Sequence, residues 1–205
     1  ILLRIFNDTY AHILMKKLER LIREYEDKIE TMMFPYSIVE NQAAELMKEC
    51  TEKNIGFIAM KPLAGGNIDD ATLAIKYIVN SPDCTIVIPG MGNAEEVEQN
   101  TSDEVYEPLT DAEKEECKKI AKELGQEFCR RCGYCAPCPQ GINIPQNFLF
   151  VNYKRKYGLG EWAQERYNTM SATAKDCVKC GLCETRCPYE LPIRAMLEKV
   201  AEEMG

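Results

Sequence analysis

The chain has 205 residues, with 25 Lys and Arg against 33 Asp and Glu, which gives a formal net charge of −8 at pH 7. This acidic balance argues against nucleic-acid binding, because the phosphate backbone demands a basic face. Apolar residues make up 45% of the chain, an ordinary share for a soluble globular protein. No apolar run approaches the roughly 18 residues that a membrane span needs. The start, Ile1 to Arg4, lacks the pattern of a signal peptide. We therefore expect a cytoplasmic protein without a membrane span.

Helices and strands alternate in the first part of the chain. From residue 11 to 28, apolar side chains recur at steps of three and four residues, which predicts an amphipathic helix. Asn93 with Glu96, and Thr110 with Glu113, form capping-box pairs that mark two further helix starts. The expected strands cover residues 31–39, 56–60 and 85–89, and the helices after them cover 41–53, 69–80 and a segment from Asn93. Strands that alternate with helices across short connections predict a parallel sheet with right-handed crossovers.

Three such β/α units cannot close a barrel by themselves, because an eight-unit barrel needs about 250 residues. This segment is therefore either a small open sheet or the end of a larger barrel. From about Gln126 the strand-like runs stop and cysteines become frequent, with helical patterns near 145–157, 161–173 and 192–203. We predict two domains, an α/β domain over residues 1–125 and a mainly α-helical domain over 126–205.

Eight of the eleven cysteines lie in two runs, CRRCGYCAPCP over 129–139 and CVKCGLCETRCP over 177–188. Three cysteines at three-residue steps can surround a four-iron, four-sulfur cluster, and the fourth, followed by proline, leaves in another direction. Paired CxxC hooks also bind structural zinc, but zinc does not call for a triple followed by Cys-Pro. We therefore predict two 4Fe-4S clusters. The scattered Cys50, Cys84 and Cys117 are expected to be packed, inert thiols.

The fourth cysteine of each run ligates the other cluster in two-cluster ferredoxins. This rule assigns Cys129, Cys132, Cys135 and Cys187 to one cluster, and Cys177, Cys180, Cys183 and Cys138 to the other. Gly133 and Gly181, each after a second cysteine, let the backbone pass close to a cluster. The first run departs from the pattern, since it has two residues and not three between its last two cysteines.

Four motifs in this order resemble the C-terminal portion of an aldo/keto reductase that carries a ferredoxin-like domain at its end. They are FPYSIVE over 34–40, IAMKPLAGG over 58–66, VIPGMGN over 87–93 and the first cysteine run. The resemblance begins at about residue 12 and implies a (β/α)8 TIM barrel, of which this sequence holds the last three β/α units. It also implies an α-helical ferredoxin-like domain after the barrel.

Members of this family reduce carbonyls with a nicotinamide cofactor and a Tyr, Lys, Asp and His on early strands. None of these four positions occurs here, so we assign no catalytic residue. The cofactor positions are partly present, although a purely structural role for the same loops fits as well. The lack of Lys or Arg between Cys84 and Glu104 disfavours NADP and leaves NAD, or no nicotinamide, as the expectation. The candidate cofactor-binding residues are Met60, Pro62, Leu63, Gly90, Met91, Asn93, Gln99 and Asn100.

Two functions from different classes follow. The first is an iron-sulfur oxidoreductase, in which the ferredoxin-like domain passes electrons to or from a site at the barrel mouth. The second is an electron-carrier or docking module without catalysis of its own. A zinc-stabilised interaction protein is a third hypothesis. The partner is then a redox protein or a small carbonyl substrate, and an unpaired strand edge could also pair with a copy of the chain.

Overall fold

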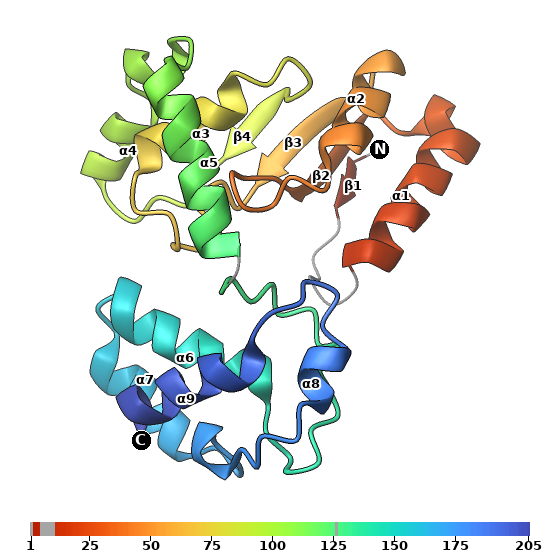
Figure 1. Ribbon diagram of the computed structural model, residues 1–205. Coiled ribbons are helices and arrows are strands. Elements are labelled where there is room, and N and C mark those ends of the chain that lie inside the picture. Colours follow the sequence, from red (N-terminus) through yellow and green to blue (C-terminus); the bar gives the residue numbers. More distant parts are fainter. Residues whose placement is uncertain (1, 5–10, 126) are drawn as a thin grey trace. The chain divides into compact units, whose positions relative to one another are not determined.

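The computed structural model describes residues 2–4, 11–125 and 127–205 (Figure 1). Its contacts form two compact units, which contain residues 11–125 and 127–205 respectively. Residue 126, where we expected the domain boundary, lies outside the described residues, as do residues 1 and 5–10. In the part of the chain that the structure describes, no helix is long and apolar enough to cross a membrane.

A parallel sheet forms the centre of the first unit, in the strand order β1-β2-β3-β4. The strands are β1 (Leu2–Arg4), β2 (Thr31–Pro35), β3 (Gly56–Met60) and β4 (Ile86–Ile88). The prediction of a parallel sheet is thus confirmed. The sequence patterns did not predict β1, and the apolar run over 31–39 is a strand only as far as Pro35. Beyond it, Ser37 and Glu40 pair in a short bridge that turns the chain.

The helices of the first unit follow the strands in the expected order. Thr110 and Glu113 make both hydrogen bonds of a capping box, whereas the Glu96 carboxylate accepts from the N–H of Gly92 and not from that of Asn93. The helical elements are α1 (Ala11–Tyr25), η2 (Glu26–Lys28), α2 (Ala44–Glu52), α3 (Ala71–Val79), α4 (Ala94–Asn100), η3 (Asp103–Tyr106) and α5 (Asp111–Gly125).

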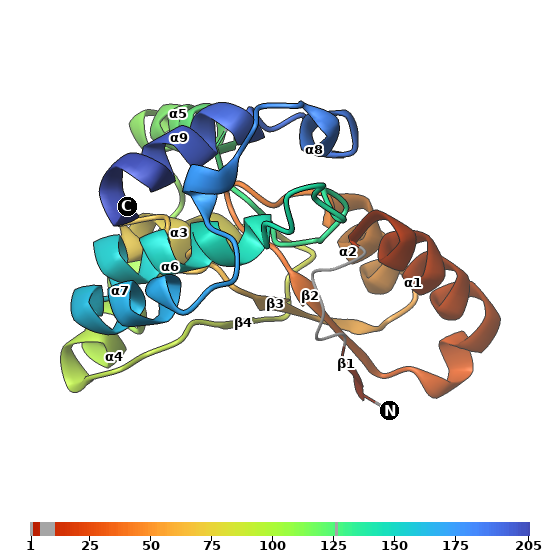
Figure 2. The same cartoon turned by 90° about the horizontal axis from the view of Figure 1, so that it is seen from below.

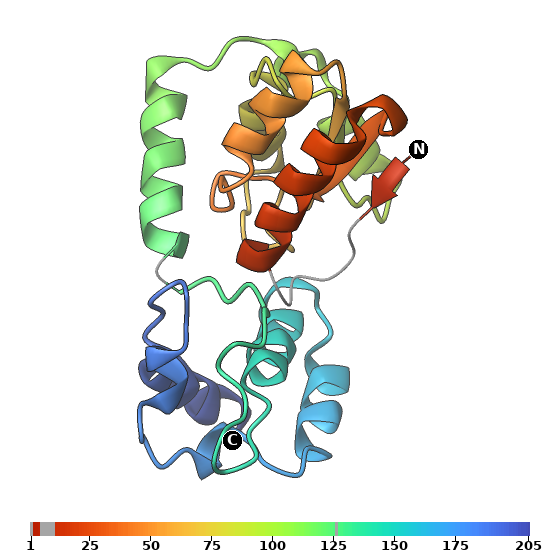
Figure 3. The same cartoon turned by 90° about the vertical axis from the view of Figure 1, so that its right-hand side faces the viewer.

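The core of this unit lies between one face of the sheet and helices α1, α2 and α3 (Figure 2). Phe57 of β3 is fully buried there. Helices α1 and α2 lie side by side (Figure 3), linked by an ion pair between Arg23 and Glu49. By contrast, Ile86 and Ile88 on β4 are 50% and 38% exposed. Both faces of a parallel sheet are normally covered, so β4 presents apolar side chains that this unit leaves exposed.

Three helices, α6 (Ile144–Lys156), α7 (Gly160–Asn168) and α9 (Ile193–Met204), pack together in the second unit (Figure 1). The short element η4 (Ala174–Asp176) precedes the second cysteine run, and α8 (Leu182–Thr185) lies within it. The expected helix over 161–173 ends at Asn168, and a separate capping box, made by Thr173 and Asp176, starts η4. Buried side chains of α6, α7 and α9 form the core, together with several of the cysteines.

Candidate metal centre

The two cysteine runs have the same backbone conformation around their second cysteine. Arg131 and Gly133 flank Cys132 with φ of 55° and 81°, and the equivalent residues of the second run have φ of 57° at Lys179 and 81° at Gly181. All four are in the left-handed region, which favours glycine and is uncommon for Arg or Lys. The two runs are therefore structural repeats, although they share few residues besides Cys and Gly.

In the first run, backbone amides turn toward the thiols. Cys129 accepts a hydrogen bond from the N–H of Arg131, and Cys132 accepts one from the N–H of Tyr134. Donors in this position stabilise negative charge on sulfur, and such hydrogen bonds tune the reduction potential of a bound cluster. The left-handed residues in the loop make this orientation of the amides possible.

The fourth cysteine of the second run, Cys187, lies near Cys129 and Cys132 of the other run. Burial is the main cause that raises the pKa of Cys129, to about 11, and the neighbouring Cys132 and Cys187 add to it. Burial also raises the pKa of Cys132, and Cys187 contributes again. For Cys135, burial and then Cys129 and Cys132 raise the pKa to about 12. The structure thus brings these four thiols into one neighbourhood.

A pocket gathers the other four cysteines. Its lining includes Cys138 from the first run and Cys177, Cys180 and Cys183 from the second, with Cys135 at the boundary between the two groups. Ile144 of α6 and Leu197 of α9 contribute apolar side chains to the lining. Sequence neighbours are thus split, since Cys138 and Cys187 each lie with the cysteines of the opposite run.

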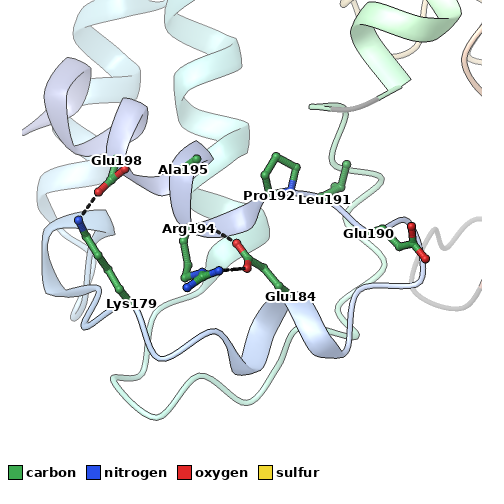
Figure 4. A pocket seen from close by; sticks show the side chains of 8 residues that line it. All are labelled: Lys179, Glu184, Glu190, Leu191, Pro192, Arg194, Ala195 and Glu198. Carbon is green, nitrogen blue, oxygen red and sulfur yellow. Dashed lines mark hydrogen bonds and ion pairs between the residues drawn. The ribbon is translucent and has the colours of Figure 1, made fainter.

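Contacts between distant segments hold the loops in place. Arg186, next to Cys187, donates a hydrogen bond of 3.0 Å to the carbonyl of Pro137, next to Cys138. Figure 4 shows two charge pairs beside the second run: Arg194 of α9 contacts Glu184 at 2.7 Å, and Lys179 pairs with Glu198. The bond from Arg194 lowers the pKa of Glu184. These pairs link the second loop to α9.

The donor set suits an iron-sulfur cluster. All eight thiols are free, and three of them, Cys132, Cys135 and Cys183, are buried. Within the described residues, no three Cys, His, Asp or Glu side chains converge closely enough to hold a single metal ion. A 4Fe-4S cluster is held by four thiolates, and the two groups of four supply that number. Outside the runs, Cys50 and Cys117 are buried and Cys84 is partly buried, and burial raises the pKa of each thiol.

The candidate cofactor residues of the first unit lie after the carboxyl ends of two adjacent strands. Met60 ends β3 and pairs with Ile88 of β4, so the segments 60–63 and 90–93 start from the same edge of the sheet. Pro62 is buried, and Met60 and Leu63 are partly buried. In the second segment, Gly90, Met91, Asn93 and Gln99 are exposed, and Asn100 is buried.

Two of these residues have evident structural roles. The side chain of Asn93 caps α4 by accepting from the N–H of Glu96 at 2.9 Å. Gln99 donates to the hydroxyl of Thr72 at 3.5 Å. Asn100 differs, since its Oδ1 is buried and makes no hydrogen bond to any described residue.

Residues 128–192 match the family model of a 4Fe-4S dicluster domain. This segment contains both cysteine runs, so the second unit holds an iron-sulfur, ferredoxin-like domain of the kind used for electron transfer. The match does not extend to the segments 34–40, 58–66 and 87–93, on which the reductase resemblance rests. No curated protein and no solved structure matches the chain.

Proposed function

We propose that the second unit carries two 4Fe-4S clusters with crossed ligands and transfers single electrons between them and a redox partner. Cys129, Cys132, Cys135 and Cys187 would hold one cluster, and Cys138, Cys177, Cys180 and Cys183 the other. The observation that carries this proposal is the position of Cys138 in the pocket of the second run. Proximity of Cys187 to the first run supports it from the other side.

When bound, such clusters supply reversible one-electron oxidation and reduction. The chain itself supplies thiolate ligands, backbone amide donors and apolar side chains beside the second site. The N–H groups of Arg131 and Tyr134 would stabilise the charge on Cys129 and Cys132. Ile144 and Leu197 would supply apolar surface to one side of the second site. Cys135 neighbours both groups, so the two clusters would be adjacent, as electron transfer between them requires.

Anaerobic purification followed by iron and acid-labile sulfide analysis tests the proposal directly. We expect about eight of each per chain, and a brown colour that dithionite bleaches. Zinc in place of iron, with no sulfide, would overturn it and favour a zinc-stabilised interaction protein.

For the first unit, we propose part of a (β/α)8 barrel of the aldo/keto reductase kind, with the chain organised as domains 1–125 and 126–205. The sequential order of four parallel strands supports this, because a barrel is built by the same succession. Ligands of such barrels bind at the carboxyl ends of the strands, which is where the 60–63 and 90–93 segments begin. A complete barrel of this kind would reduce a small carbonyl compound, with NADH favoured over NADPH as the reductant.

The alternative is an electron-carrier or docking module without catalysis of its own. Binding of NADH and of NADPH, followed by fluorescence, and turnover of small aldehydes with NADH separate the two. Turnover by this chain would exclude the carrier alternative. If neither nucleotide binds while the iron content remains as expected, the carrier function stands alone.

A further inference from the structure

Arg130 lies at the point where the two cysteine runs meet. Its guanidinium carbon lies 4.1 Å from the ring centroid of Tyr189, which comes two residues after Cys187, and 5.3 Å from that of Phe128. The side chain also donates a hydrogen bond of 3.3 Å to the carbonyl of Phe128, and its Nε is buried. The attraction between a cation and an aromatic face is stronger when the cation is desolvated. These contacts therefore fix the position of the guanidinium.

The charge of Arg130 acts on the group that contains Cys132. Arg130 lies between Cys129 and Cys132 in the chain, and its guanidinium lies over the ring of Tyr189, two residues after Cys187. Its positive charge is therefore placed close to the ligands that we assign to the first cluster. The same charge would favour the reduced state of a bound cluster, since reduction adds one negative charge. Partial burial strengthens the effect, because the local dielectric is lower than in water.

Two cations lie beside the second group. Arg194 contacts Glu184 at 2.7 Å, and Lys179 pairs with Glu198, so a carboxylate offsets each positive charge (Figure 4). Glu184 directly follows Cys183 in the chain, so the carboxylate of this pair lies next to a ligand of the second group.

We propose that Arg130, whose guanidinium lies over the rings of Phe128 and Tyr189, is a positioning residue that raises the reduction potential of the cluster bound by Cys129, Cys132, Cys135 and Cys187. This inference rests on the proposed function of the second unit. The one-electron step is the uptake of a single electron from an external donor, without bond cleavage. The guanidinium favours that uptake through its charge and joins the second run to the first through Tyr189.

The test is a mediated redox titration of the purified holoprotein with dithionite, followed by electron paramagnetic resonance. Arg130→Gln removes the charge and keeps a planar polar group. Arg130→Lys keeps the charge. Arg166→Gln is the matched control, because Arg166 also lies over an aromatic ring in this unit, 5.5 Å from that of Trp162 on α7. A second background, Cys177→Ser with Cys180→Ser, leaves the first cluster alone and identifies its signal.

In Arg130→Gln we expect the ratio of reduced to oxidised first cluster, at fixed potential, to fall on the order of tenfold. Tenfold corresponds to a shift of about 59 mV for one electron. The reduction potential of the second cluster should not change in Arg130→Gln. In Arg130→Lys and Arg166→Gln, the potentials of both clusters should remain near those of the unsubstituted protein. Should Arg130→Gln lose its first cluster, retention in Arg130→Lys with an unchanged potential would support the electrostatic role.

The inference would be overturned by equal shifts in the reduction potentials of both clusters, by no shift in either potential, or by loss of the first cluster in both Arg130 variants. The iron and sulfide content of the parent protein separates this result from failure of the proposed function. A parent without clusters refutes the function. If the unsubstituted protein holds about eight irons but substitution of Arg130 leaves the cluster potentials unchanged, only the role of this residue is refuted.

Discussion

In crossed ligation, Cys138 and Cys187 each bind the cluster of the other run, whereas in sequential ligation each run binds a cluster with its own four cysteines. The two arrangements predict opposite effects of replacing Cys138 and Cys187. A background variant with Cys177→Ser and Cys180→Ser removes two ligands from the second group, and we expect iron to fall from about eight to about four per chain. In this background, Cys138 has no cluster left to bind, because it lines the pocket of the second run. Cys187 still has one, because it neighbours Cys129 and Cys132.

The decisive step is the third substitution. Adding Cys138→Ser should leave about four irons and the spectrum unchanged, whereas adding Cys187→Ser should remove a ligand and reduce iron well below four. Iron and sulfide analysis with electron paramagnetic resonance measures both. If ligation is sequential, Cys138→Ser abolishes the remaining cluster and Cys187→Ser is silent. That result would refute the crossed arrangement.

Three further predictions concern the first unit. Phe57→Ala should destabilise it by about 3–5 kcal/mol, because a fully buried ring is lost and a cavity remains; a denaturation midpoint close to that of the parent would contradict this packing. Glu113 accepts a hydrogen bond of 2.6 Å from the buried Lys76, which is the main cause that lowers its pKa from 4.5 to about 2. The resulting stability is present above pH 4.5 and is lost as the pH falls toward 2, so Glu113→Gln should flatten the thermal stability profile across that window, and an unchanged slope would argue against it. Replacing Ile86 and Ile88 by Thr should reduce self-association in sedimentation velocity, because both lie exposed on β4; equal sedimentation of variant and parent would exclude this edge.

Periodicity predicted the order of helices and strands from residue 11 onward, because apolar spacing and capping residues are local signals. Thr110 and Glu113, for example, form the predicted capping box at the start of α5. The strand β1 could not be predicted, because residues 1–10 show no alternation that distinguishes a strand. The exposure of Ile88 was also beyond the sequence, since burial depends on what covers a face and not on the residue itself.

Cysteine spacing alone predicted the metal centre, because three thiols at three-residue steps carry strong geometric information. The left-handed conformation at Arg131 and Lys179 could not be predicted, since neither residue type favours positive φ. The capping box at Thr173 had a readable signal in Asp176, three residues on. The contact between Arg130 and Tyr189 joins the two runs across a long stretch of chain, and no local pattern encodes it.

The same strained conformation at Arg131 and Lys179 connects local structure to function. Unfavourable backbone conformations persist only where surrounding contacts determine them. At the second run, the pairs of Lys179 with Glu198 and of Arg194 with Glu184 link the loop to α9. Between the runs, the hydrogen bond from Arg186 to Pro137 supplies such a contact. A glycine at position 179 would relieve the strain and lose the pair with Glu198.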